Sequence, residues 1–136
     1  MRIEDTVVSL WLAKELKEAG VNSPSLFYWR IWSDGSVGCA MCDEEDFDFS
    51  GTGKTVVEKI QAYTAAELIE KLPGFIRQSN DTKYILSIHK FSDGYAIGYE
   101  RCYDNVLKYF LQEFESEKLA DALAKMLIWW RKREVK

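Results

Sequence analysis

The sequence contains little cysteine and almost no histidine: its 136 residues include three cysteines and one histidine. An odd number of cysteines argues against a framework of disulfide bonds. Long apolar runs are also missing, because the longest, residues 126–130, is far too short to span a bilayer. Arg2, Glu4 and Asp5 leave no apolar run near the start of the kind found in secretory signals. We therefore expect a soluble protein of a reducing compartment, the cytoplasm.

Excess positive charge is absent as well, because 18 lysines and arginines stand against 22 aspartates and glutamates, a net charge of −4. Domains that bind nucleic acid usually carry a strong basic excess, so we do not expect nucleic acid as a partner. The length fits a single domain, residues 1–136. A hydrophobic content of 47% is typical of a globular protein, whereas an aromatic content of 14% is high.

Three segments have the apolar periodicity of helices. They are residues 5–19, 63–74 and 116–133. Gly20 follows the first segment where a left-handed C-terminal cap is expected. Thr64 and Glu67 have the spacing of a capping box, in which each side chain satisfies a backbone donor of the other residue. The sequence therefore predicts helices at both ends and in the middle.

Six segments are rich in aromatic and β-branched residues or alternate with a period of two, and so favour strands. They are residues 26–32, 36–42, 54–60, 83–91, 95–103 and 106–114. Ser-Asp-Gly at 33–35 and at 92–94 predicts a hairpin turn in each half, because glycine accepts a positive φ without steric cost. Asp104 and Asn105 mark a third turn.

These elements follow one another in the order α-βββα-βββα. We predict an α+β fold with a largely antiparallel sheet of about six strands and helices packed on one face. Ser-Asp-Gly directly follows an aromatic residue in both halves, Trp32 in the first and Phe91 in the second. Two interpretations stay open: an internal duplication, or the general preference of hairpin turns for Asp-Gly.

Residues 51–55, Gly-Thr-Gly-Lys-Thr, have the appearance of a phosphate-binding loop. Such a loop requires a glycine five residues before its Gly-Lys-Thr, and that position is Asp48. It also requires a helix to follow, whereas residues 54–60 alternate like a strand. Residues 43–48 supply five carboxylates that would repel phosphate. We therefore expect a glycine-rich loop entering a strand, not a nucleotide-hydrolysing site.

Cys39 and Cys42 form a Cys-x-x-Cys pair, and Cys102 and His89 would complete a tetrahedral zinc set. The pair falls in or at the end of a predicted strand and leads into an acidic loop. A zinc knuckle would need a tight turn at this position, and a redox dithiol would need the N-terminus of a helix. We therefore expect ordinary half-buried cysteines and no metal. Whether the four side chains converge is a question for the tertiary structure.

No group of polar side chains has a spacing that commits the chain to a reaction. His89 has neither a cysteine nor an orienting acid nearby in the sequence, which Cys-His catalysis would need. The acidic run 43–48 lacks the ligand spacing of a calcium loop. We expect a non-enzymatic protein without a cofactor, in which this run is a solvated loop that repels or steers a partner.

Alternation along the strands produces two stripes in which arginine stands between aromatic residues. Tyr28, Arg30 and Trp32 share one face of the first strand, and Tyr99 and Arg101 repeat the pattern with Tyr103 in the second half. Aromatic side chains can stack on a planar ring of a ligand, and arginine can bind an anionic group. Together they suit a nucleotide-like ligand. A dimer interface and a helix-covered core are two further interpretations of the same pattern.

Three stretches resemble a set of short, uncharacterised phage and prophage accessory proteins. They are LAKELKEAGVNSPSLFYW, AYTAAELIEKLP and DALAKMLIWW. No activity is attached to this family as a class, so the resemblance carries over no functional residue. A phage origin implies an accessory protein that acts in the host cytoplasm by binding, either sequestering a nucleotide immune signal or blocking a host protein.

Two hypotheses follow. In the first, the protein binds a small anionic ring-containing ligand, through aromatic stacking by Tyr28, Trp32 and Tyr99. Arg30 and Arg101 would hold its phosphate, and the protein could be a homodimer. In the second, it is a protein–protein interaction module without a small ligand that uses the same aromatic surface or the acidic loop.

Overall fold

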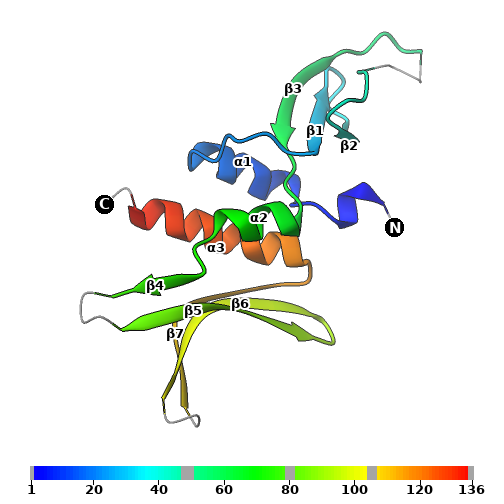
Figure 1. Ribbon diagram of the computed structural model, residues 1–136. Helices are drawn as coiled ribbons and strands as arrows, with labels where there is room; N and C mark the ends of the chain where they lie inside the picture. Colours follow the sequence, from blue (N-terminus) through cyan, green and yellow to red (C-terminus); the bar gives the residue numbers. More distant parts are fainter. Residues whose placement is uncertain (1, 47–50, 79–81, 104–106, 135–136) are drawn as a thin grey trace.

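The computed structural model describes the backbone of residues 2–46, 51–78, 82–103 and 107–134, and the side chains of these residues outside 102–109 and 134. Two antiparallel sheets lie on opposite sides of a layer of helices (Figure 1). The helices are α1 (Leu10–Glu18), α2 (Ala65–Lys71) and α3 (Leu119–Glu134), and a short 3-10 helix, η1 (Ile3–Asp5), precedes them.

Three strands from the first half form the smaller sheet, in the order β2-β1-β3. They are β1 (Phe27–Trp32), β2 (Val37–Met41) and β3 (Val56–Gln61). Four later strands form the larger sheet, in the order β4-β5-β6-β7. They are β4 (Phe75–Arg77), β5 (Lys83–Phe91), β6 (Gly94–Tyr103) and β7 (Leu107–Ser116).

The α+β class is confirmed, but the prediction of one sheet with helices on one face is wrong. β1 pairs on both edges within the first half, with β2 and with β3, so the strands of the two halves form separate sheets. The described strands number seven, because residues 75–77 pair with β5 and extend the larger sheet. A strand of three residues is too short to produce a periodic pattern, which is why the sequence did not reveal it.

Local signals predicted two helix ends correctly, the C-terminus of α1 and the N-terminus of α2. Gly20 adopts a φ of 89°, and the amides of Gly20 and Val21 donate to Lys17 and Leu16, which is the predicted left-handed cap. The capping box is present, since the amide of Glu67 donates to the Thr64 hydroxyl and the amide of Thr64 to the Glu67 carboxylate. The first helix starts later than predicted, at Leu10.

One hydrophobic core cluster joins the helical layer to both sheets. Leu12 and Leu16 of α1 and Leu123 of α3 are fully buried in it. Trp29 enters from the smaller sheet, and its indole nitrogen donates to the carbonyl oxygen of Val8 over 2.9 Å. The helices therefore bury apolar surface on two sides. The expectation of a single domain over residues 1–136 stays a prediction.

Candidate functional site

The outer face of the smaller sheet carries the first of the two predicted stripes. Tyr28, Arg30 and Trp32 alternate along β1, and Lys59 of β3 lies directly opposite Arg30 in the strand pairing. Lys54, in the loop before β3, lies against the ring of Trp32. We call these five residues the cation–aromatic cluster. Two of them, Lys54 and Lys59, were not among the residues that the sequence predicted to bind a ligand.

Three members of the cluster converge on a single carboxylate, that of Asp46 from the acidic loop. The Lys59 ammonium lies 2.5 Å from Asp46 Oδ2, and the Tyr28 hydroxyl lies 3.0 Å from Asp46 Oδ1. The guanidinium of Arg30 is 4.0 Å from the same Oδ1. One carboxylate of the acidic loop therefore contacts the stripe, while residues 43–46 remain exposed to solvent. Its residues 47–50 lie outside the described part of the chain.

The pKa values of Asp46 and Lys59 shift in the directions that favour their ion pair, and the pKa of Tyr28 is also raised. The hydrogen bond from Lys59 holds the pKa of the Asp46 carboxyl below its usual range, and the same bond raises the pKa of Lys59. Burial raises the pKa of the Tyr28 phenol, and the bond to Asp46 adds to this effect. At neutral pH the site is thus an ammonium, a guanidinium and a neutral phenol around an ionised carboxylate.

The aromatic rings of the cluster are covered by cations. The guanidinium carbon of Arg30 lies 5.2 Å from the centre of the Trp32 ring, and the ammonium of Lys54 lies 4.9 Å from it. The Lys59 ammonium lies 4.9 Å from the centre of the Tyr28 ring. Cations at these distances are attracted to the ring face. The tyrosine and tryptophan are accordingly only 6% and 7% exposed, so the cluster presents positive charge and not bare rings.

Arg30 is poorly satisfied for a residue whose side chain is only 16% exposed. Its Nη1 reaches the carbonyl oxygen of Glu45 over a long 3.4 Å. Its Nε is buried and has no acceptor among the residues that the structure describes. A buried donor without a partner is costly. The acidic loop therefore leaves the hydrogen-bonding capacity of the guanidinium incompletely satisfied.

The second predicted stripe lies on the other sheet and does not meet the first. Tyr99 is fully buried in the core, and its hydroxyl donates to the carbonyl oxygen of Pro73 over 2.6 Å. Its burial raises the pKa of the phenol. Arg101 lies over the ring of Tyr84, at 5.8 Å from its centre. The side chain of Tyr103 lies outside the described part. Tyr99 has the position of a core residue.

The Gly-Thr-Gly-Lys-Thr segment leads into a strand, as the alternation predicted. Gly51 and Gly53 adopt φ values of 71° and 76°, and β3 begins at Val56. A phosphate loop would require a helix here. Lys54 instead reaches back to the first hairpin, where its ammonium lies 3.9 Å from the carboxylate of Asp34. The lysine that suggested a phosphate loop thus belongs to the cation–aromatic cluster.

Cys39 and Cys42 belong to β2 and the segment directly after it, whereas His89 and Cys102 belong to the larger sheet. Cys39 lies on β2, half-buried, and burial raises the pKa of its thiol to about 11. His89 lies on β5 of the larger sheet, with its Nε2 3.4 Å from Glu100 Oε2. The side chain of Cys102 is outside the described set. Within that set no three histidine, cysteine, aspartate or glutamate side chains gather as metal ligands would.

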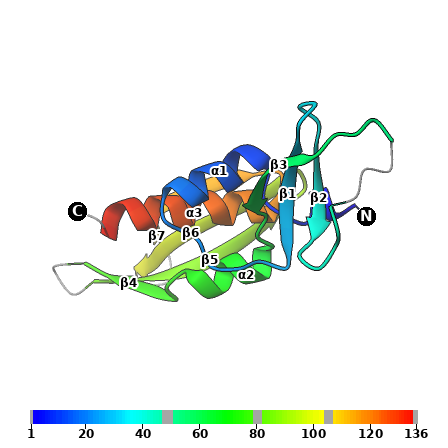
Figure 2. The same ribbon diagram turned by 90° about the horizontal axis from the view of Figure 1, so that it is seen from above.

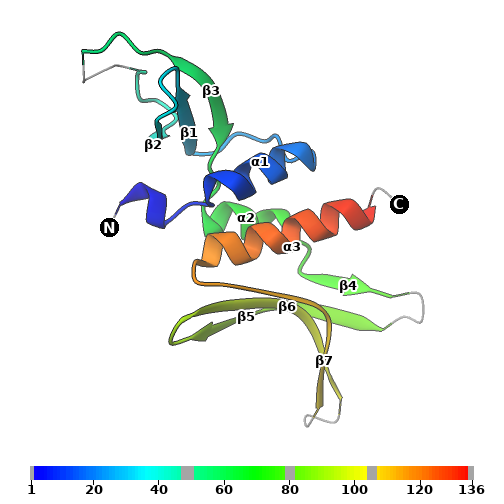
Figure 3. The same ribbon diagram turned by 180° about the vertical axis from the view of Figure 1, so that it is seen from behind.

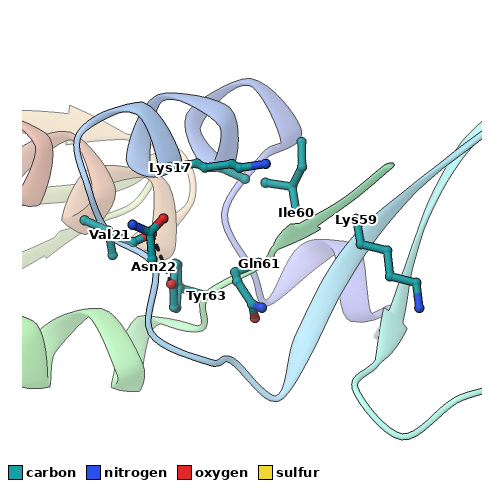
Figure 4. Close-up of a pocket in the computed structure, with 8 residues that line it drawn as sticks. Lys17, Val21, Asn22, Lys59, Ile60, Gln61 and Tyr63 are labelled. Carbon is teal, nitrogen blue, oxygen red and sulfur yellow. Dashed lines mark hydrogen bonds between the residues drawn. The ribbon is translucent and has the colours of Figure 1, made fainter. Parts of the chain in front are cut away.

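A small hollow lies beside the cluster, between α1 and β3 (Figure 4). Its volume is about 200 Å³, and Ile60, Gln61 and Tyr63 contribute to its lining. Lys59 lines one side, but its ammonium points away from the other labelled residues in the figure. Lys17 lies on the opposite side, 3.9 Å from the carboxylate of Glu58. Neither lysine directs an unpaired charge into the hollow, so the outer face remains the better candidate.

The sequence contained one signal for the contacts between the stripe and the acidic loop, although those contacts were not predicted. An acidic run and a stripe with the opposite charge are the features most expected to meet. Sequence spacing could not show that they do, because Asp46 and Lys59 lie 13 positions apart on either side of the glycine-rich segment.

No family model, curated protein or solved structure matches the chain. The resemblance to phage accessory proteins and the function it implies therefore stay expectations. Among the described helices, none combines the length and the apolar character needed to cross a membrane.

Proposed function

We propose that the protein is a non-enzymatic binding protein that holds a small anionic, nucleotide-like ligand at the cation–aromatic cluster. One observation carries the proposal: Tyr28, Arg30 and Lys59 converge on the carboxylate of Asp46. Charge-assisted bonds from several donors to one oxyanion are how proteins recognise carboxylates and phosphates. In this structure the oxyanion is supplied by the chain itself.

The cations of the cluster, more than its aromatic rings, would make the main contacts with the ligand. Because Arg30 and Lys54 cover the Trp32 ring, a phosphate group would meet them before any ligand ring could stack. A ring could stack on Trp32 once a phosphate draws Lys54 aside. Tyr99 and Arg101 are left out of this site, since they belong to the other sheet. A phosphate-bearing ligand agrees with the nucleotide signal that the phage resemblance implies.

Asp46 makes the proposal testable, because it would compete with the ligand for the same donors. The first experiment is a thermal-shift screen against mononucleotides, cyclic di- and trinucleotides and ADP-ribose derivatives. A ligand at a hundred times its dissociation constant adds about 2.7 kcal/mol of stability, enough to raise the melting temperature by several degrees. Affinities of the best compound are then measured by calorimetry at constant ionic strength.

Two substitutions should move the affinity in opposite directions. Arg30→Ala should weaken binding roughly tenfold or more, because a hydrogen bond to a charged group contributes about 1.5–3 kcal/mol. Asp46→Ala should strengthen binding, because it removes the internal competitor. Lys83→Ala, on the larger sheet, is the control and should change nothing. A flat screen, or an affinity indifferent to both substitutions, would reject the proposal.

A protein partner is the second candidate function, and the free face of the larger sheet favours it. Phe75, Ile85, Phe91 and Phe110 are 46%, 55%, 53% and 42% exposed there. Exposed apolar patches of this kind mark interaction surfaces. Ile85→Asp should then abolish capture of a host protein and leave any nucleotide-induced thermal shift unchanged. The opposite pattern would support the cluster alone.

A further inference from the structure

A groove with an apolar part runs between α1 and α3 and is open to solvent. One part has a volume of about 380 Å³ and is lined by Trp11, Leu12, Phe114, Ile128 and Trp129, with charged residues at its rim. A second part of about 400 Å³ adjoins it, since both are lined by Glu15, Ile128 and Lys132. Figures 2 and 3 show the two helices side by side.

Trp11 is the most unusual residue of this groove. It is 55% exposed although tryptophan is among the residues that gain most from burial. It lies at the end of the groove where the two helices begin, because the amide of Ser9, just before α1, donates to the Asp121 carboxylate at the start of α3. The two helices therefore run in the same direction, with Trp11 beside an open apolar hollow.

The two walls of the groove carry opposite charges. Glu15 and Glu18 stand on the α1 wall, and Lys125 and Lys132 on the α3 wall. The Lys125 ammonium donates to the backbone carbonyl of Glu115. No ion pair crosses the groove among the described residues. An occupant that carries cations opposite α1 and carboxylates opposite α3 would satisfy both walls.

We propose that this occupant is a second copy of the chain, docked about a two-fold axis parallel to the groove. Rotation about that axis places the acidic wall of one copy over the basic wall of the other, so Glu15 faces Lys132 twice in the dimer. An axis across the groove would oppose like charges instead. The same rotation carries Trp11 of each copy over the α3 wall of its partner, beside the hollow that Phe114 and Trp129 line. Self-complementary contacts of this kind define a two-fold interface.

The test uses two charge reversals that are complementary to each other. Glu15→Lys alone should weaken the dimer roughly tenfold or more, because two lysines would then face each other at both contacts. Lys132→Glu alone should do the same with two carboxylates. An equimolar mixture of the two variants should form a heterodimer of near wild-type affinity, because both contacts regain opposite charges. Sedimentation velocity over a concentration series measures all three.

The mixture also shows that both variants fold, since only folded chains can restore the interface. Glu70→Lys, an exposed position on α2, is the control and should dimerise like the wild type. Trp11→Ala should weaken the dimer as well. A wild-type chain that stays monomeric at every concentration overturns the proposal. So does a dimer that neither reversal weakens, or a mixture that fails to associate.

Discussion

Tyr28 and Tyr99 each precede an arginine by two positions, yet their hydroxyl groups meet different surroundings. The hydroxyl of Tyr28 lies 3.0 Å from the carbonyl oxygen of Glu44 and from the carboxylate of Asp46, both in the acidic loop. Among the residues that the structure describes, the hydroxyl of Tyr99 donates to one backbone carbonyl, that of Pro73. A phenol beside charged groups can serve recognition, whereas a phenol bonded to a buried carbonyl serves stability.

Tyr99→Phe should therefore destabilise the protein and leave the affinity for the ligand unchanged. Loss of the hydroxyl leaves the Pro73 carbonyl without this donor, for which we expect about 1 kcal/mol, because that is the usual net value of a protein hydrogen bond. Urea denaturation measures the loss, and calorimetry should give an unchanged affinity. An unchanged stability with a weakened affinity would instead return Tyr99 to the binding site.

At the scale of elements, one carboxylate joins α2 to the start of the smaller sheet. Glu67 accepts from the amide of Thr64 over 2.9 Å, which caps the helix, and from the Ser25 hydroxyl over 2.8 Å. It also accepts from the amide of Leu26 over 3.2 Å. Ser25 and Leu26 lead into β1, so the cap of the helix also fixes the start of the strand that carries the cation–aromatic cluster.

Removing this carboxylate should cost more than removing the cap hydroxyl. Thr64→Ala should lower the free energy of unfolding by about 1 kcal/mol, the usual value for a helix cap. Glu67→Ala should lower it by about 2 kcal/mol or more, because the amides of Thr64 and Leu26 lose their acceptor and the Ser25 hydroxyl loses one of two acceptors. Glu70→Ala, exposed on the same helix, should stay within about 0.5 kcal/mol. Equal losses for Thr64→Ala and Glu67→Ala would show that the contacts to Ser25 and Leu26 contribute little.

At the scale of the whole molecule, the helical layer is shared by two sheets that do not pair with each other. α3 packs against β6 and β7 on one side and against α1 on another, and α1 in turn packs against β3. The cation–aromatic cluster, the α1–α3 groove and the free face of the larger sheet lie on different parts of this arrangement. Each can therefore be altered without changing the other two.

Leu123→Ala tests whether the shared core unites the two sheets. Leu123 is fully buried in α3, and truncation of such a residue costs about 2–5 kcal/mol. Hydrogen exchange followed by mass spectrometry should show protection falling together in peptides from β1 and from β6. Protection that falls in β6 and persists in β1 would show two independent folding units and would contradict the single-domain prediction.

Local features of this fold were determined by the sequence alone. Gly20 ends α1, Thr64 and Glu67 begin α2, and Ser-Asp-Gly turns the β1–β2 and β5–β6 hairpins, because these signals act between residues a few positions apart. The alternation of Tyr28, Arg30 and Trp32 was predictable for the same reason. Three of the five residues of the cation–aromatic cluster were therefore predictable from the sequence.

Pairing between distant segments was decided only by the tertiary structure. Alternation shows which residues share a face, but two faces of equal apolar character do not reveal which neighbour covers each one. Tyr28 and Tyr99 stand in the same sequence pattern, two positions before an arginine. Packing against the helices is what places Tyr99 in the core. The convergence of Lys59 and Arg30 on Asp46 likewise depends on β1 pairing with β3 and on the acidic loop folding back. Such contacts arise from the summed burial of the whole chain, which no short stretch encodes.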